Sequence, residues 1–72
     1  KVIDPDLKTV NVRTSWFTAR KSYYQRKYDV SEKSYMDVIE NTQDNFDAYG
    51  ELGNVYFNQG KNKLAAQAYF SA

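Results

Sequence analysis

The last third of the chain decides the fold, and it reads Phe46-Asp-Ala-Tyr-Gly-Glu-Leu-Gly-Asn-Val-Tyr-Phe-Asn-Gln-Gly-Lys-Asn-Lys-Leu-Ala-Ala-Gln-Ala-Tyr-Phe-Ser-Ala72. Large and small apolar residues recur in it three and four positions apart, which is typical of amphipathic helices. Gly60 interrupts the pattern near its middle. Because glycine readily adopts the left-handed conformation that closes a helix, we predict two helices joined at this residue. The first should run to about Gln59.

The same stretch carries a spaced motif, Tyr49-x-x-Leu52-Gly53-x-x-Tyr56, then Gly60, then Ala65-x-x-x-Tyr69-x-x-Ala72. This motif resembles the tetratricopeptide repeat, in which an aromatic residue, Leu-Gly and Tyr precede Ala-x-x-x-aromatic on a second helix. The resemblance covers nearly all of one repeat. It implies an all-α chain of antiparallel helix-turn-helix repeats, stacked as a short right-handed α-solenoid of about four helices. The residues expected to pack these helices together are Tyr49, Leu52, Gly53, Tyr56, Gly60, Ala65, Ala68 and Tyr69.

Close packing of two antiparallel helices explains the small residues of the motif. Helix axes approach each other only where side chains are small, so we expect Gly53 to face Ala65. A bulky or charged residue at Gly53 should therefore do more damage than most changes. On the fourth helix, we expect Leu64 and Tyr69 to face inward as well.

The beginning of the chain is harder to interpret. Residues 1–11 are either a lead-in or an extension of the first helix, started by Asp4-Pro5-Asp6 or else capped at Asn11. Val12 to Lys27 contains no Gly or Pro, and its large side chains recur at helical spacing. This predicts an amphipathic helix with a broad aromatic face.

Polar residues mark where the other helices should begin. Asp29 and Glu32 have the spacing of a capping box, and the helix that follows should run to about Asn41 with Tyr35 and Val38 on its inner face. The residues expected to cap the second, third and fourth helices are Asp29, then Asp44 or Asn45, then Asn62.

The two halves of the chain correspond when the second is shifted back by one repeat length, which is about 34 residues in repeats of this kind. Gly53 then corresponds to Ala19, and Gly60 to Arg26. We infer a degenerate repeat at residues 12–45 and a well-matched repeat at residues 46–72, truncated in its second helix. Sliding the first helix by one residue would instead put Trp16, Ala19 and Tyr23 at the motif positions. We favour the unshifted alignment, because it needs no deletion in the turn.

The composition excludes several classes of function. The 72 residues include no Cys and no His, so disulfides, structural zinc and histidine-based catalysis are not expected. No Gly-rich phosphate loop occurs. We predict that the chain is not an enzyme and has no cofactor, metal or small-molecule substrate. No signal peptide or membrane-spanning run is visible, and Lys1 is not a start Met, so we expect a piece of a longer protein. Cytoplasm and bacterial envelope are both compatible.

Charge is unevenly distributed along the chain. Residues 1–28 carry seven Lys or Arg against two Asp, a balance of +5, and residues 29–72 carry three Lys against seven acidic residues, a balance of −4. The acidic second half argues against nucleic acid as a partner, because it would repel phosphate.

We predict a protein–protein interaction module, a scaffold or adaptor that holds a peptide or protein segment in the concave groove that the resemblance implies. A basic and aromatic stripe on the first helix would suit an acidic or aromatic segment. Trp16 belongs either to this groove or to the core. The expected partner-binding residues are Arg13, Trp16, Arg20, Tyr23 and Lys27 on the first helix, with Asn54, Phe57 and Asn58 on the third.

The alternative is a structural spacer or self-association module within a larger protein, without a ligand of its own. The chain lacks the closing helix that normally covers a last repeat. Leu64, Tyr69 and Phe70 should then present apolar surface, through which two copies would form a homodimer.

Overall fold

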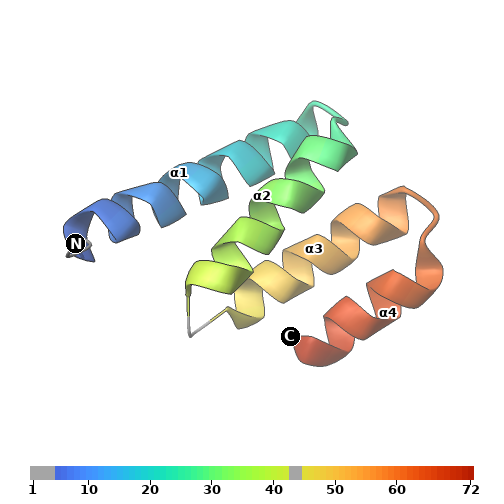
Figure 1. The fold of residues 1–72 in the computed structure, drawn as a ribbon. Helices are drawn as coiled ribbons and strands as arrows, with labels where there is room; N and C mark the ends of the chain where they lie inside the picture. The colour runs from blue at the N-terminus through green and yellow to red at the C-terminus, as the bar shows by residue number, and fades with distance from the viewer. Residues whose placement is uncertain (1–4, 43–44) are drawn as a thin grey trace.

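Four α-helices make up the fold of the computed structural model, which describes residues 5–42 and 45–72, with side chains described from residue 11 onward (Figure 1). The helices are α1 (Pro5–Tyr24), α2 (Tyr28–Asn41), α3 (Phe46–Asn58) and α4 (Asn62–Ser71). Two antiparallel pairs form, α1 with α2 and α3 with α4, and α3 also packs against α2 (Figure 1). No strand occurs in the described residues. The predicted all-α class is confirmed.

The first helix begins at the earlier of the two starts that the sequence left open, and it ends earlier than the sequence predicted. It starts at Pro5, whose fixed φ suits a first helical position, and continues through Asn11, which is therefore not a cap. It ends at Tyr24 instead of Lys27, because Arg26 has a φ of +62° and leaves the helical region. The expected contribution of Asp4 lies outside the described residues.

The turn between α1 and α2 has the same backbone geometry as the turn between α3 and α4. Gly60 has a φ of +77°, so its prediction as a left-handed closing residue is confirmed, and Arg26, 34 residues earlier (60 − 26), takes the same conformation. The hydrogen bonds also recur at that spacing: Arg26 N–Tyr23 O at 3.0 Å and Lys27 N–Ser22 O at 2.8 Å, then Gly60 N–Phe57 O at 3.0 Å and Lys61 N–Tyr56 O at 2.9 Å. The chain thus builds the same turn twice, once with arginine and once with glycine.

Two of the predicted side-chain caps are wrong. The N-cap of α2 is Lys27 and that of α4 is Lys61, and neither makes a side-chain capping hydrogen bond. Asp29 is the second residue of α2 and Asn62 is the first residue of α4, because each helix starts directly after its turn. Both residues therefore lie within the helices that they were expected to cap. Glu32 is drawn away from its own helix start, since its Oε1 accepts from Gln59 Nε2 at 3.2 Å and Lys61 Nζ lies 3.4 Å away.

Asn45 is the N-cap residue of α3, but its side chain does not cap that helix. Its Nδ2 donates to the backbone oxygens of Ile39 and Thr42, at 3.1 and 3.2 Å. The amide therefore holds the end of α2 instead of the start of α3. The alternative cap, Asp44, lies outside the described residues.

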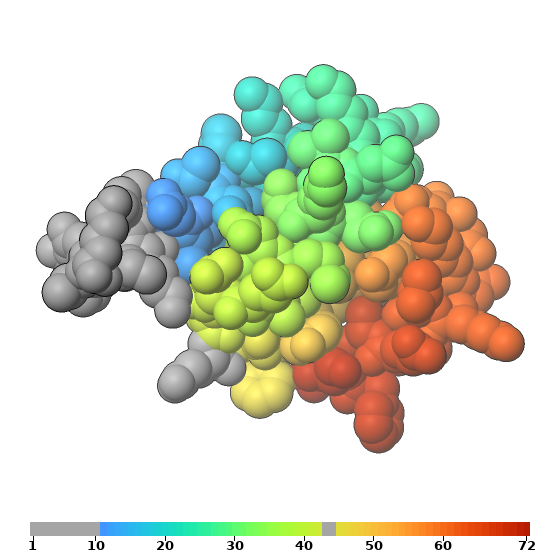
Figure 2. Space-filling model, in the orientation of Figure 1, coloured from blue at the N-terminus to red at the C-terminus, as the bar shows by residue number. Residues whose placement is uncertain are grey.

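The core lies where α1, α2 and α3 meet. Ala19, Tyr35, Leu52 and Val55 form its buried cluster. Ser31 is fully buried beside it, and its hydroxyl donates to Ala19 O at 2.8 Å across the α1–α2 contact. The space-filling view shows α2 between α1 and the α3–α4 pair (Figure 2). The polar Ser31 is accepted here because it has a hydrogen-bond partner.

The second helix pair packs through small residues, with one difference from the expectation. Ala65 and Ala68 are buried on α4, and Gly53 is buried on α3. A Cβ on Gly53 would lie 2.6 Å from the ring of Tyr69, so the tyrosine ring occupies the space expected for Ala65. The Tyr69 side chain is nevertheless 43% exposed, and that of Leu64 is 42% exposed. Neither residue is therefore buried in the way the sequence predicted.

Candidate functional site

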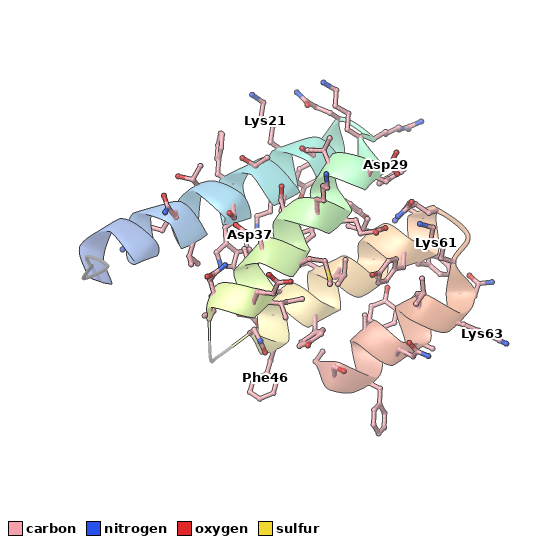
Figure 3. All side chains as sticks on the ribbon, in the orientation of Figure 1. Lys21, Asp29, Asp37, Phe46, Lys61 and Lys63 are labelled. Carbon is pink, nitrogen blue, oxygen red and sulfur yellow. The ribbon has the colours of Figure 1, made fainter. Side chains whose placement is uncertain are left out.

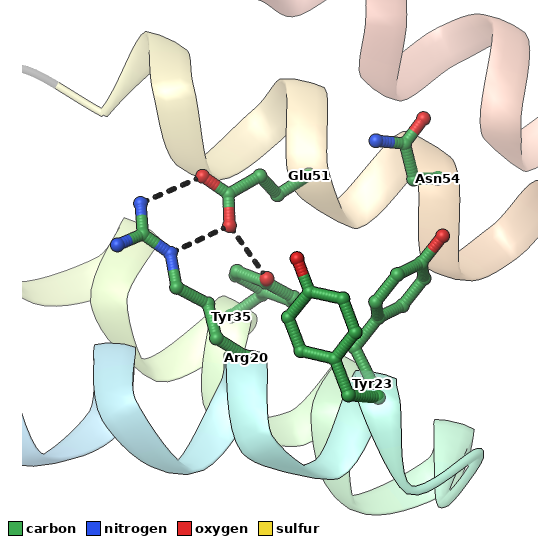
Figure 4. A pocket seen from close by; sticks show the side chains of 6 residues that line it. Arg20, Tyr23, Tyr35, Glu51 and Asn54 are labelled. Atoms are coloured by element: carbon green, nitrogen blue, oxygen red, sulfur yellow. Dashed lines mark hydrogen bonds and ion pairs between the residues drawn. The ribbon is translucent and has the colours of Figure 1, made fainter.

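A pocket of about 380 Å³ opens between α1 and α3, with α2 behind it (Figure 4). It combines a charged pair with aromatic rings and an amide, and it draws on three helices. Its lining side chains are Arg20, Tyr23, Tyr24, Tyr35, Glu51 and Asn54.

A hydrogen-bonded charge cluster forms one wall of this pocket (Figure 4). The Arg20 guanidinium donates to both carboxylate oxygens of Glu51, from Nε at 3.0 Å and from Nη2 at 2.9 Å. The Tyr35 hydroxyl donates to the same carboxylate at 2.7 Å. Such two-point pairing fixes the orientation of both groups. Residues from α1, α2 and α3 are therefore tied together at a single carboxylate.

The cluster sets the protonation states of its members. Partial burial favours the neutral acid of Glu51, but the hydrogen bonds from Arg20 and Tyr35 outweigh it together and leave the pKa of this carboxyl below its ordinary value. Burial, followed by the hydrogen bond to Glu51, raises the pKa of the Tyr35 phenol. At neutral pH the glutamate is thus ionised, the phenol is protonated, and the arginine charge is already neutralised inside the protein.

Amide and hydroxyl groups form the other wall. Asn58 Nδ2 donates to the Tyr23 hydroxyl oxygen at 3.0 Å, and the Tyr69 hydroxyl donates to Asn54 Oδ1. Within the described part of the chain, no side chain accepts from Asn54 Nδ2, and Tyr23 acts only as an acceptor. Both groups can therefore donate hydrogen bonds to a molecule in the pocket.

The structure places the predicted stripe in several environments. Arg20, Tyr23 and Asn54 line the pocket, and Asn58 lies beside it through its bond to Tyr23. Arg13 is exposed on α1, and Phe57 is exposed on α3 without lining the pocket.

Trp16 combines the two positions that the sequence left open. It is half-buried, packs against the core cluster and meets Tyr35 edge to face, with ring centroids 6.0 Å apart. The Arg20 guanidinium lies 4.6 Å from the centre of its ring. The indole thus supports the charged wall of the pocket from the core side.

Lys27 belongs to a second, shallower pocket of about 420 Å³ at the turn end of the molecule. This pocket adjoins both turns, because residues of the first turn and Gln59 of the second turn line it. Gln59 is also hydrogen-bonded to Glu32 of α2. Figure 3 shows Lys21, Lys61 and Lys63 toward this end and Asp37 away from it. The lining residues are Arg26, Lys27, Tyr28, Asp29, Val30 and Gln59.

The sequence reasoning did not find Glu51 or Tyr24 as site residues, and it assigned Tyr35 to the core alone. Glu51 lies 31 residues after Arg20, so no local spacing rule connects them. Tyr35 is buried as expected, yet its hydroxyl is the part that reaches the pocket. Pairing of oppositely charged residues across the predicted helix faces was the one signal that could have suggested Glu51.

Comparisons with known protein families, with curated proteins and with solved structures each gave no match. Among the described residues, no group of three or more acidic, His or Cys side chains is placed to hold a metal ion. None of the helices in the described part of the chain combines the length and apolar character needed to cross a bilayer.

Proposed function

We propose that the chain is a protein–protein interaction module of tetratricopeptide-like helical repeats, which binds a protein or peptide segment across the face formed by α1 and α3. Support for the repeat comes from the two turns, whose conformation and hydrogen bonds recur at the spacing that separates Arg26 from Gly60. Support for binding comes from the α1–α3 pocket, which gathers donors and aromatic rings from three helices at an open surface. This pocket is the observation that carries the proposal.

The chemistry of the pocket suggests what kind of segment it takes. Glu51 already neutralises Arg20, so the pocket offers little net charge to a carboxylate. The donors that remain, on Asn54 and Tyr23, suit the carbonyl oxygens of an extended peptide backbone. The exposed ring of Tyr24 adds apolar area for a side chain of the segment. Acidic residues of a segment longer than the pocket would meet Arg13, which is exposed on α1, and Lys27, which lines the second pocket.

A peptide selection tests this proposal. Peptides selected from a random display library on the immobilised 72-residue chain should shift the backbone amide resonances of Arg20, Tyr23 and Asn54. Asn54→Ala should weaken the binding of a selected peptide by about tenfold, the effect of roughly one lost hydrogen bond. Lys63→Ala, a change at an exposed residue of α4, is the matched control and should leave binding unchanged.

Two results would overturn the proposal. One is a selection whose binders all shift resonances away from the α1–α3 face. The other is an Asn54→Ala protein that keeps full affinity for peptides that do map to the pocket. Circular dichroism of each variant separates loss of binding from loss of the fold.

A further inference from the structure

The chain exposes two apolar faces, and of the residues that form them only Tyr24 also lines the α1–α3 pocket. One is a stripe on α1, formed by Phe17, Lys21 and Tyr24 at positions i, i+4 and i+7; Phe17 is 67% exposed and Tyr24 is 82% exposed. The other lies on α3 and α4, where Phe57 is 64% exposed and Tyr69 is 43% exposed. We name these the α1 stripe and the α3–α4 face. Exposed apolar areas of this kind commonly mark contact surfaces.

The internal packing of the chain shows how such surfaces fit together. The α3 helix docks on the α1–α2 pair through a stripe of its own, Glu51, Val55 and Asn58. Glu51 bonds to Arg20 and Tyr35, Asn58 bonds to Tyr23, and Val55 is fully buried. Shifting this stripe back by one repeat length, the spacing at which the turns recur, converts it into Phe17, Lys21 and Tyr24. The α1 stripe is therefore the counterpart of the docking stripe of α3.

The receiving surface is also repeated. Shifting Trp16, Arg20, Tyr23 and Tyr35 forward by one repeat length gives Gly50, Asn54, Phe57 and Tyr69. Tyr35 is 2% exposed because α3 covers it, whereas its counterpart Tyr69 is 43% exposed. The α3–α4 face is thus the counterpart of a surface that this same chain covers with a helix.

We propose that the α1 stripe of one copy docks on the α3–α4 face of a second copy, in the arrangement that α3 takes on α1 and α2. The occupant is a second copy because a single chain carries both halves of the contact, related by its own repeat. The contact is heterologous, so it leaves one stripe and one face free and continues into longer chains of molecules.

The side chains that change between the two surfaces fit this pairing. Phe17 replaces Glu51 of the docking stripe, and Gly50 replaces Trp16 beside it. The small residue leaves space for the phenylalanine ring at the place where tryptophan supports an ion pair inside the chain. Tyr24 would come beside Phe57, which allows an aromatic pair where Asn58 and Tyr23 are hydrogen-bonded internally.

Lys21 limits the strength of the contact. It stands where α3 has the fully buried Val55, and its ammonium lies 5.9 Å from the centre of the Phe17 ring on the free surface. Covering this lysine requires its charge to reach solvent past the partner helix, which reduces affinity. The proposal therefore predicts a weak, concentration-dependent association that one substitution strengthens.

Sedimentation of the 72-residue chain over a concentration series tests the contact. The weight-average mass should rise with concentration, and Lys21→Val should shift the same rise to concentrations about tenfold lower, because it restores an apolar group at the Val55 position. Lys63→Val, at an exposed residue of α4 outside the contact, is the matched control and should not shift it. An unchanged monomer for both the original chain and Lys21→Val would overturn the proposal.

A mixing experiment tests the head-to-tail geometry. Phe17→Lys breaks the α1 stripe and Phe57→Lys breaks the α3–α4 face, so each protein alone should sediment as a monomer. Their mixture should form a complex of one copy of each, because each still carries one intact surface. A mixture that stays monomeric, or a symmetric dimer of either variant alone, would contradict the geometry. Phe17 and Phe57 do not line the α1–α3 pocket, so peptide binding there is a separate measurement.

Discussion

Two glycines on α3, Gly50 and Gly53, should respond in opposite ways to the same substitution. A Cβ on Gly50 would lie 3.8 Å from the Cβ of Ala72, an ordinary contact distance, whereas a Cβ on Gly53 would lie 2.6 Å from Cδ1 and Cε1 of Tyr69. Both residues are inside the helix, where alanine is favoured over glycine by about 0.8–1 kcal/mol. Gly50→Ala should therefore stabilise the fold by about that amount.

Gly53→Ala gains the same helix propensity but collides with the Tyr69 ring. Moving the ring disturbs its packing on α3 and its hydrogen bond to Asn54. Overpacking of this kind costs about 1–3 kcal/mol, so the net effect should be a loss of up to roughly 2 kcal/mol. The two alanine variants should then differ in their free energy of unfolding by about 1–3 kcal/mol.

Equilibrium urea unfolding, followed by circular dichroism, measures this difference. A second background isolates its cause: in Tyr69→Ala the ring is gone, so Gly53→Ala should become stabilising, as Gly50→Ala is in the original chain. The reasoning fails if Gly53→Ala is as stable as Gly50→Ala, or if the cost of Gly53→Ala is unchanged when Tyr69 is truncated. Either result would mean that the ring does not limit the space at Gly53.

The first turn and the charge cluster give two further predictions. Arg26→Gly should raise the free energy of unfolding by about 1 kcal/mol, because glycine adopts positive φ without strain. Gly60→Arg should lower the free energy of unfolding by a similar amount, about 1 kcal/mol. Effects of the same sign in the two variants would contradict this reasoning. The folded-state pKa of Glu51 lies below its unfolded value, so its contribution to stability is present above the unfolded pKa and is lost as pH falls through the folded pKa. We expect that acid-induced loss to be below about 1 kcal/mol, since the Arg20 side is half exposed. Urea unfolding across the acid range should show this loss of stability in the original chain and in the exposed-site control Glu40→Gln. The loss should be absent in Glu51→Gln.

Much of the fold was predictable because its determinants are local. The helices at residues 28–41, 46–58 and 62–71 lie within a few residues of their predicted positions, since periodic apolar residues and Gly60 act over single turns of the chain. The end of α1 was misplaced because arginine at a positive φ has no local signal.

The caps were predicted poorly because polar side chains have competing partners. Asn45 and Glu32 both occur where a cap was expected, yet each bonds to a different helix or helix end. A spacing rule weighs only the local backbone, and the folded chain offered these side chains partners that the rule does not include. Capping predictions are therefore weakest where two helices meet, as they do at both of these residues.

The sequence by itself determined an all-α chain, the turn at Gly60 and the helix faces that become apolar, because each depends on residues within one or two helical turns of each other. Only the tertiary structure decided the site. Arg20, Tyr35 and Glu51 come from three helices and are joined by hydrogen bonds between residues 16 and 31 positions apart. Their pairing depends on how α3 docks on α1 and α2, and that docking is a balance of burial and polar contacts over the whole interface that no single stretch of sequence specifies.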